Sequence, residues 1–203
     1  MKSNWFMAKT ALWVLCLAPA ARLGWGVLHP ESTILGVNPV QYLLWACGWW
    51  ALFLLTATLA ITPLKRVSGW TWLQRFQRPL GLFAFAYAAL HFLVYVLLDQ
   101  AGAWNQIPGD LVKRPFIVVG MLALLILLSL AITSTTGWQK RLKRKWKRLH
   151  RLIYMAALLG VIHFAWKEKV GWREPRVLAF AVAVTVLLLV RLPLRRWPSK
   201  ATT

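Results

Sequence analysis

Acidic residues are scarce in this chain of 203 residues, which has five of them against 25 lysines and arginines. Charge of either sign is missing from three long stretches, residues 32–64, 79–98 and 115–139. A soluble domain carries about a quarter of its residues as charged side chains, whereas the fraction here is 15%. Because about 20 apolar residues span a bilayer as a helix, each stretch predicts a transmembrane helix.

Cysteine is almost absent too, with Cys16 and Cys47 as the two examples. They show no metal-binding spacing, and Cys16 should lie too deep in lipid for an outer disulfide, so both are interpreted as packing residues. Carboxylates are missing from every predicted span. This absence argues against a di-iron site, which needs glutamate ligands, and against a carboxylate proton relay.

Three further apolar segments complete the predicted bundle. Residues 10–28 contain Arg22, residues 149–166 contain two histidines, and residues 177–192 form a shorter run. Because backbone groups in lipid must be satisfied within the chain, we predict an all-α fold, a polytopic membrane helical bundle with six transmembrane helices. The expected spans are about 8–28, 43–62, 80–98, 115–133, 149–166 and 176–193.

The first apolar segment also has features of a signal peptide, with a basic start, the apolar run "ALWVLCLAPA" and then small residues. Cleavage near Ala20 would leave the topology of the remaining chain unchanged, so the loop charges do not decide between the alternatives. We expect the segment to be retained, because the apolar pattern resumes in "LGWGVL".

The loop charges alternate along the chain. Four segments are basic and contain no acid: the N-terminus, residues 63–79, residues 134–151 and the tail from Arg191, which includes Arg195, Arg196 and Lys200. All five acids lie in the other three loops: Glu31, Asp99, Asp110, Glu168 and Glu174. The positive-inside rule then predicts that both termini are cytoplasmic. The net charge of +20 favours contact with membrane lipid headgroups, and no nucleic acid partner is expected because the cations lie in short loops at span ends.

Histidine is rare as well, and two of the four histidines lie deep within predicted spans, while His150 lies at the inner end of the fifth. His91 and His163 lie about 16 Å and about 21 Å from the inner ends of two outward-running helices, so they share a depth in the outer half of the bilayer. A single membrane histidine is equally well explained as a hydrogen bond between helices. Two histidines at one depth favour axial ligation of a haem iron inside the bundle.

The other two histidines lie elsewhere. His150 lies about 20 Å along the helix axis from His163, so the two cannot ligate one iron. It is a candidate for a second haem, for contact with a haem propionate, or for a cap on the preceding loop. His29 precedes Pro30 in the first outer loop and is expected to be solvated.

A family resemblance is carried by three segments: "LAITPLKRVSG", "RPLGLFAFAYAALHFLVYVLLD" and "LAITSTTGWQKRLKRKWKRLHRLIYMAALLGVIHFAW". They resemble the MsrQ family, the haem-binding membrane subunits of bacterial periplasmic methionine sulfoxide reductase systems. That family belongs to the ferric-reductase-like transmembrane group, which includes the NADPH oxidases. The resemblance is close over residues of about 40–170 and implies a single ferric-reductase-like transmembrane domain over residues 1–203.

The resemblance implies roles for individual residues. His91 and His163 match the outer axial ligands of a haem b iron, and His150 matches the inner histidine of the fifth span. Two-haem members of the group carry a further inner histidine on the third span, where this chain has Gln77 and Arg78. That departure argues against a conventional inner bis-histidine haem. Arg78 is a candidate contact for a propionate or a phosphate, with a solvated loop arginine as the alternative.

The resemblance also implies cofactors and partners. Besides heme b it implies bound FMN, for which residues 134–151 are the expected phosphate or protein contact. The expected donor is a cytoplasmic flavin reductase or quinol, since the chain has no glycine-rich nucleotide fingerprint. The expected acceptor is a periplasmic molybdenum-cofactor methionine sulfoxide reductase of the MsrP type, and the chain would be an electron-transfer subunit, not the catalytic one, in the bacterial inner membrane.

Two alternatives remain open at this point. One is a stand-alone metalloreductase or quinol oxidoreductase built on the same bundle. The other is a haem-free transporter or assembly protein in which the histidines join helices, although spans without carboxylates or broken half-helices do not favour transport.

Overall fold

The computed structural model describes residues 2–101, 103, 105, 107–168 and 171–191. Within these ranges every regular element is a helix. The cations predicted for the tail, Arg195, Arg196 and Lys200, lie outside the described residues, as do the last two positions of the sixth predicted span.

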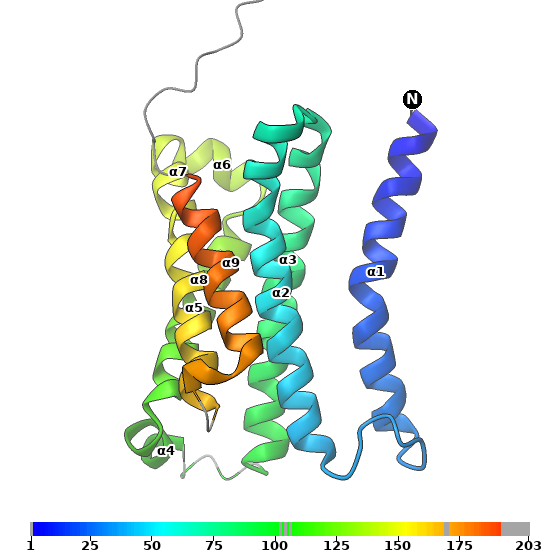
Figure 1. Ribbon diagram of the computed structural model, residues 1–203, viewed down its shortest axis with the longest axis vertical. Coiled ribbons are helices and arrows are strands. Elements are labelled where there is room, and N and C mark those ends of the chain that lie inside the picture. The colour runs from blue at the N-terminus through cyan, green and yellow to red at the C-terminus, as the bar shows by residue number, and fades with distance from the viewer. Residues whose placement is uncertain (1, 102, 104, 106, 169–170, 192–203) are drawn as a thin grey trace, which may run out of the picture.

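Long helices form the body of the protein (Figure 1). They are α1 (Lys2–Leu28), α2 (Pro39–Ser68), α3 (Gln74–Val94), α5 (Pro115–Ile132), α8 (Leu152–Lys167) and α9 (Pro175–Leu189). The shorter elements are η1 (Thr71–Leu73), a π-helical turn η2 (Tyr95–Asp99) that continues α3, α4 (Ile107–Lys113), α6 (Thr136–Leu142), α7 (Arg144–His150) and η4 (Gly171–Arg173).

Five described helical segments are long and apolar enough to cross a membrane, and α9 is a shorter apolar helix. The prediction of a polytopic helical membrane bundle is therefore confirmed. The sixth span differs in length from the prediction, because α9 has 15 residues, or about 22 Å, where residues 176–193 were expected.

Local sequence signals set the helix ends. Asn38 caps α2 by accepting a hydrogen bond from the backbone N–H of Gln41 at 3.2 Å, and Pro39 follows at the first helical position. Gly69 ends the same helix with φ of 73°, a left-handed conformation that glycine adopts without strain. Proline also opens α5 and α9, at Pro115 and Pro175.

The surface of the bundle is apolar. Leu122 and Leu125 of α5 are 49% and 57% exposed, and only 22% of that helix is buried. Leucines exposed in this way along a whole helix need lipid around them, because water would make their exposure costly. The two cysteines, Cys16 and Cys47, are free and buried, which confirms their interpretation as packing residues.

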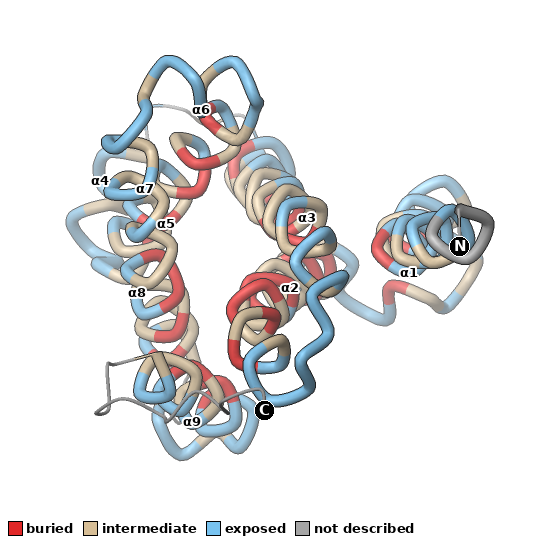
Figure 2. Tube along the Cα trace, turned by 90° about the horizontal axis from the view of Figure 1, so that it is seen from above, coloured by how far each residue is buried: buried red, intermediate tan, exposed pale blue. Residues whose placement is uncertain are grey.

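The centre of the bundle lies between two pairs of helices, seen from above in Figure 2. The antiparallel pair α2 and α3 faces the pair α5 and α8, and α9 packs against both α2 and α8. Helix α1 stands outside this ring beside α2 and α3. The cavity described below lies between the two pairs.

Helix α1 is joined to the ring at the turn that contains Pro19. The Tyr87 hydroxyl accepts a hydrogen bond from the Ala20 N–H at 2.9 Å and donates one to the Cys16 carbonyl at 2.7 Å. In a regular helix those two backbone groups would bond each other, so the tyrosine is inserted into the backbone hydrogen-bond ladder. This contact holds α1 against α3.

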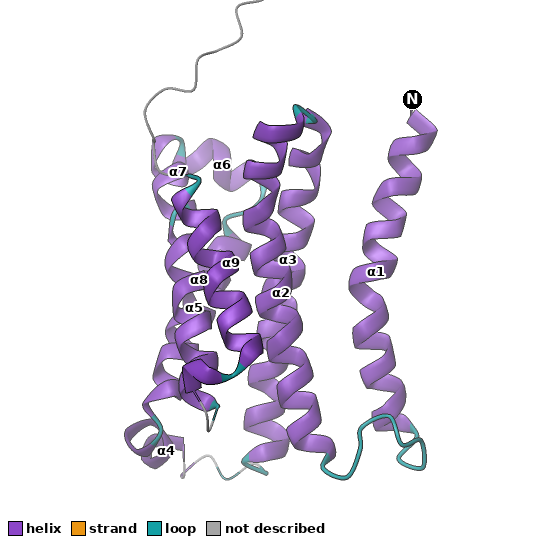
Figure 3. Cartoon of the chain, viewed as in Figure 1, coloured by secondary structure: helices purple, strands orange, loops and turns teal. Residues whose placement is uncertain are grey.

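The loops alternate between the two ends of the bundle (Figure 3). The start of α1, the α2–α3 turn and the short helices α6 and α7 lie at one end, together with the end of α9. The loops that contain the five acids lie at the other end. The chain thus places its acid-free basic loops at one end and its acidic loops at the other, as the sequence predicts.

Candidate functional site

The two helix pairs are an internal repeat. One sequence interval relates Leu44 to Phe116, Gly48 to Gly120, and His91 to His163. The first member of each couple belongs to the α2–α3 pair and the second to the α5–α8 pair. The repeat therefore brings two equivalent histidines to the centre of the bundle from opposite sides.

Each histidine is held by the backbone of its own pair. The Nδ1 of His91 lies 2.8 Å from the Leu44 carbonyl, and the Nδ1 of His163 lies 2.7 Å from the Phe116 carbonyl. A carbonyl can only accept, so each Nδ1 carries the proton and donates it. The Nε2 of each neutral ring is left with a free lone pair, and metal-ligating histidines are oriented by this kind of bond.

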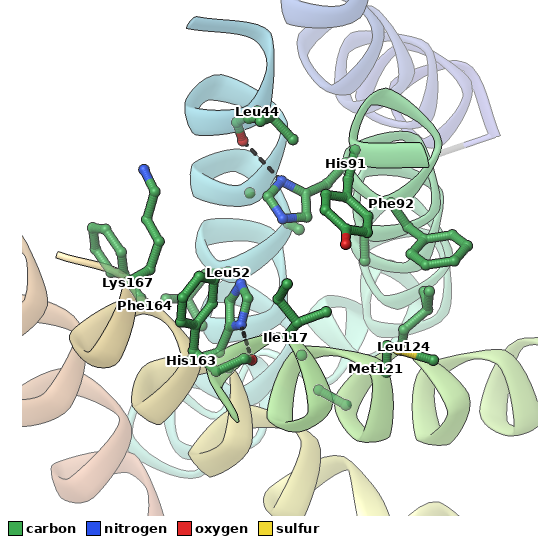
Figure 4. Close-up of a pocket in the computed structure, with 18 of the residues that line it drawn as sticks. Leu44, Leu52, His91, Phe92, Ile117, Met121, Leu124, His163, Phe164 and Lys167 are labelled. Carbon is green, nitrogen blue, oxygen red and sulfur yellow. Dashed lines mark hydrogen bonds between the residues drawn. The ribbon is translucent and has the colours of Figure 1, made fainter. Parts of the chain in front are cut away.

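The two rings face each other across the centre. Their centroids are 5.9 Å apart and their planes are perpendicular, at 89°. The second nitrogen of each ring is turned toward the other ring (Figure 4). The expectation that His91 and His163 share a depth is confirmed, and the structure brings together two neutral nitrogen donors.

Each imidazole lies close to the neighbouring helix of its own pair, and a glycine on that helix makes this possible. A Cβ atom at Gly48 would lie 3.1 Å from Nδ1 of His91, and a Cβ at Gly120 would lie 2.7 Å from Nδ1 of His163. These are closer than ordinary contacts between heavy atoms. Both glycines are thus part of the site, one helical turn after the carbonyls that accept from the histidines.

A cavity of about 280 Å³ surrounds the rings. Its walls are mostly apolar side chains from α2, α3, α5 and α8, including Leu52, Leu55, Ile117, Leu124 and Phe164. Gln41, Asp99, Arg114 and Lys167 also line it, and they lie at or next to the helix ends that carry the acidic loops. The cavity therefore has an apolar interior and a polar mouth.

The donor set fits a haem iron. Among the described residues, no group of three or more histidines, cysteines or acids could hold a metal ion. Two imidazoles without further protein ligands suit an iron whose other coordination positions are filled by a macrocycle. The apolar walls suit the faces of a porphyrin, and the polar mouth suits its carboxylates.

His150 lies in α7 and does not line the cavity. Its ring centroid lies 3.9 Å from that of Trp146 with the two planes tilted by 30°, and the Trp146 indole N–H donates to the Thr133 carbonyl at 2.9 Å. The His150 Nδ1 is buried and has no hydrogen-bond partner within the described part of the chain. This histidine therefore lacks the backbone bond that orients the two central ones.

The other residues singled out in the sequence lie apart from the cavity. The repeat interval relates Arg78 to His150, and Arg78 is exposed near the start of α3. His29 stacks on Trp25 at 3.8 Å and lies 3.1 Å from its carbonyl, where it caps the end of α1.

Sequence reasoning missed four residues of this site. Gly48 and Gly120 could have been found by aligning the two histidine-containing segments, because the repeat places them at equivalent positions. Lys167 follows His163 by one helical turn and so lies on the same helix face. Arg114 lies just before the start of α5, and its proximity to the cavity is a tertiary contact that no local pattern indicates.

Comparison with known proteins gives a consistent result. Residues 47–161 match the family described as ferric reductase like transmembrane component. A protein of Xanthomonas campestris pv. campestris (strain 8004) named protein-methionine-sulfoxide reductase heme-binding subunit MsrQ is 50% identical over 180 residues, which cover 87% of this chain and 83% of the relative. The protein of that name from Herminiimonas arsenicoxydans is 45% identical over 188 residues, with 91% and 84% covered. No solved structure matches the chain.

Proposed function

Because the chain belongs to the MsrQ family of ferric-reductase-like membrane proteins, we propose that it is a haem b electron-transfer subunit that serves a periplasmic methionine sulfoxide reductase. The acceptor is a molybdenum-cofactor enzyme of the MsrP type, and the donor is a cytoplasmic flavin reductase or the quinol pool. The chain then forms one ferric-reductase-like domain over residues 1–203 in the bacterial inner membrane.

The observation that carries this proposal is the opposed pair of histidines. His91 and His163 would hold the haem iron through Nε2, while Leu44 and Phe116 fix the ring orientation through Nδ1. The bound haem supplies one-electron iron chemistry. The apolar walls from four helices exclude water from the iron, which helps to set its redox potential.

The position of the site favours electron exit at the acidic end. The cavity opens among residues at the ends of α3, α5 and α8, and these ends carry the loops at 99–114 and 167–176. Under the positive-inside rule this end is periplasmic. Electrons leaving the haem would then have a short path to a periplasmic partner.

Charges at that end are already organised within the chain. Asp110 pairs with Arg114 at 3.6 Å, Glu168 with Lys167 at 3.7 Å, and Glu174 with Arg176 at 3.5 Å. The acids of the last two pairs are 26% and 23% exposed, and such pairs are weak, so a partner can compete for them with its own cations. They would affect association rate and its salt dependence more than final affinity.

The basic end would receive the electrons. His150, with its unpartnered Nδ1, and Arg78 are our proposed contacts for an anionic group there, either a propionate of a second haem or a phosphate. The segment at 134–151 is our proposed contact for FMN or for a flavin reductase, because it combines eight lysines and arginines with no acid.

Electron delivery across a sealed membrane tests the proposal. The haem-loaded protein is reconstituted into vesicles, and only inside-out vesicles, with the 134–151 segment outward, should reduce haem with an external flavin reductase. A lumenal sulfoxide reductase should then reoxidise the haem and repair methionine sulfoxide. Haem that reduces soluble ferric chelates but never a sulfoxide reductase would instead support the stand-alone metalloreductase.

A further inference from the structure

The mouth of the histidine cavity carries a pair of cations. Among the described residues that line the cavity, the charged ones are Asp99, Arg114 and Lys167. The Arg114 and Lys167 side chains are 50% and 31% exposed, and Asp99 is exposed as well. The walls farther inside are apolar, so a ligand carboxylate buried there would lack a partner, which is costly.

We propose that Arg114 and Lys167 bind the two propionates of the group held between His91 and His163, an inference that rests on the proposed function. A haem b carries both propionates on one edge of an otherwise apolar disc. The cavity matches that distribution, because its cations lie at the mouth while leucine, isoleucine and phenylalanine side chains form its walls. The propionate edge therefore points toward the acidic end of the bundle.

Arg114 pairs with an aspartate that is itself held by hydrogen bonds. Asp110 accepts hydrogen bonds from the Tyr95 hydroxyl at 3.2 Å and the Gln100 amide at 2.8 Å, and it pairs with Nε of Arg114 at 3.6 Å. The Asp110 side chain is only 16% exposed. An arginine paired through Nε keeps its terminal N–H groups for another carboxylate, and such pairs can be bidentate.

Lys167 is placed by helix geometry. It is the last residue of α8 and lies one turn beyond His163, so its ammonium group extends from the helix that carries an axial ligand. Its pair with Glu168, at 3.7 Å, uses one of three N–H donors. The remaining donors can reach a carboxylate at the mouth.

The internal repeat does not explain these cations. The interval that relates His91 to His163 relates Tyr95 to Lys167 and Tyr42 to Arg114. Both cations therefore belong to the second pair of helices, while tyrosines occupy the equivalent positions of the first. The histidines, glycines and carbonyls of the site follow the internal repeat, whereas the two cations do not. A requirement to bind carboxylates on one side of the site would produce this asymmetry.

Replacing each cation by a neutral residue of similar length tests the inference. Holoprotein with Arg114→Gln, Lys167→Gln or both is mixed with excess apomyoglobin, and the rate of haem transfer is measured. Each single change should speed transfer roughly tenfold, the low end for a lost charged hydrogen bond in a partly exposed site. Lys113→Gln is the matched control, because Lys113 neighbours Arg114 but does not line the cavity.

The dimethyl ester of haem b separates propionate binding from a general loss of fit. Wild type loaded with the ester should release it as fast as the double variant releases haem, and the double variant should no longer distinguish haem from ester. Arg114→Lys should restore part of the distinction. The low-spin haem spectrum should be unchanged in all variants, since the two histidines that would ligate the iron are untouched.

Two results would overturn the inference. If the double variant still releases the ester faster than haem by the factor seen in wild type, other groups bind the propionates. If one single variant releases haem at the wild-type rate, the residue changed in it does not bind a propionate. If wild type retains no haem, the proposed function itself fails and the inference with it. A normal haem complex with indifferent cations would overturn this inference alone.

Discussion

Gly120→Ala adds one methyl group against the ring of His163. The new Cβ would lie 2.8 Å from Cε1 of that ring, whereas ordinary carbon contacts are about 3.5 Å, so the ring must retreat by about 0.7 Å. At Gly48 the equivalent Cβ would lie 3.2 Å from Cε1 of His91, and about 0.3 Å of movement suffices. The two substitutions therefore form a graded pair.

The opposing energy terms predict a net loss of haem affinity for Gly120→Ala and a net change near zero for Gly48→Ala. Forcing an extra methyl group into a packed site costs about 1–3 kcal/mol, while alanine in place of a helical glycine gains about 0.5–1 kcal/mol. At Gly120 the moved ring also strains the 2.7 Å bond from His163 to Phe116. A net loss of about 1–2 kcal/mol corresponds to roughly five- to thirtyfold weaker haem retention.

Haem content, the low-spin optical spectrum and the transfer rate to apomyoglobin measure this effect. Gly120→Ala should lose haem fastest, Gly48→Ala should be intermediate or close to wild type, and Gly24→Ala should match wild type. Gly24 is the control because a Cβ there would meet nothing within 4 Å. Wild-type haem content and spectrum in Gly120→Ala would refute the reasoning, as would a larger loss from Gly48→Ala.

Three further changes probe other parts of the molecule. Tyr87→Phe removes both hydrogen bonds to α1 and should lower the free energy of unfolding by about 1–3 kcal/mol. Thermal unfolding should then occur at a lower temperature with an unchanged haem spectrum, and an unchanged midpoint would contradict the role of that hydroxyl. His150→Ala should keep the signal of the central haem, because His150 does not line the cavity; loss of all haem would make it a primary ligand. Cysteines introduced at residues 140–148 should react with an impermeant reagent from the cytoplasmic side, and labelling from the periplasm would invert the topology.

Sequence patterns predicted most of the helices and the central pair of histidines, since long uncharged runs and helical rise act over a single segment. The length of α9 differed at its end, because the helix begins at Pro175, close to the predicted start, but ends at Leu189, before Arg191. Apolar residues continue past the helix end, so composition alone does not indicate where the helix stops.

The support of the histidines could not be read from local pattern. The bonds from His91 to Leu44 and from His163 to Phe116 join residues on different helices, and they exist only after each pair has packed. The role of Gly120 likewise depends on a ring from another helix. The insertion of Tyr87 into α1 depends on the packing of α1 against α3, which Pro19 alone does not predict.

The optical and electron paramagnetic resonance spectra of the purified protein test axial ligation by His91 and His163 most directly. Wild type should show a Soret band and a low-spin haem b signal, and His91→Ala and His163→Ala should each abolish that low-spin signal, since each removes one axial imidazole. Wild type without a Soret band, or a wild-type low-spin spectrum in both variants, would contradict haem ligation by these two histidines.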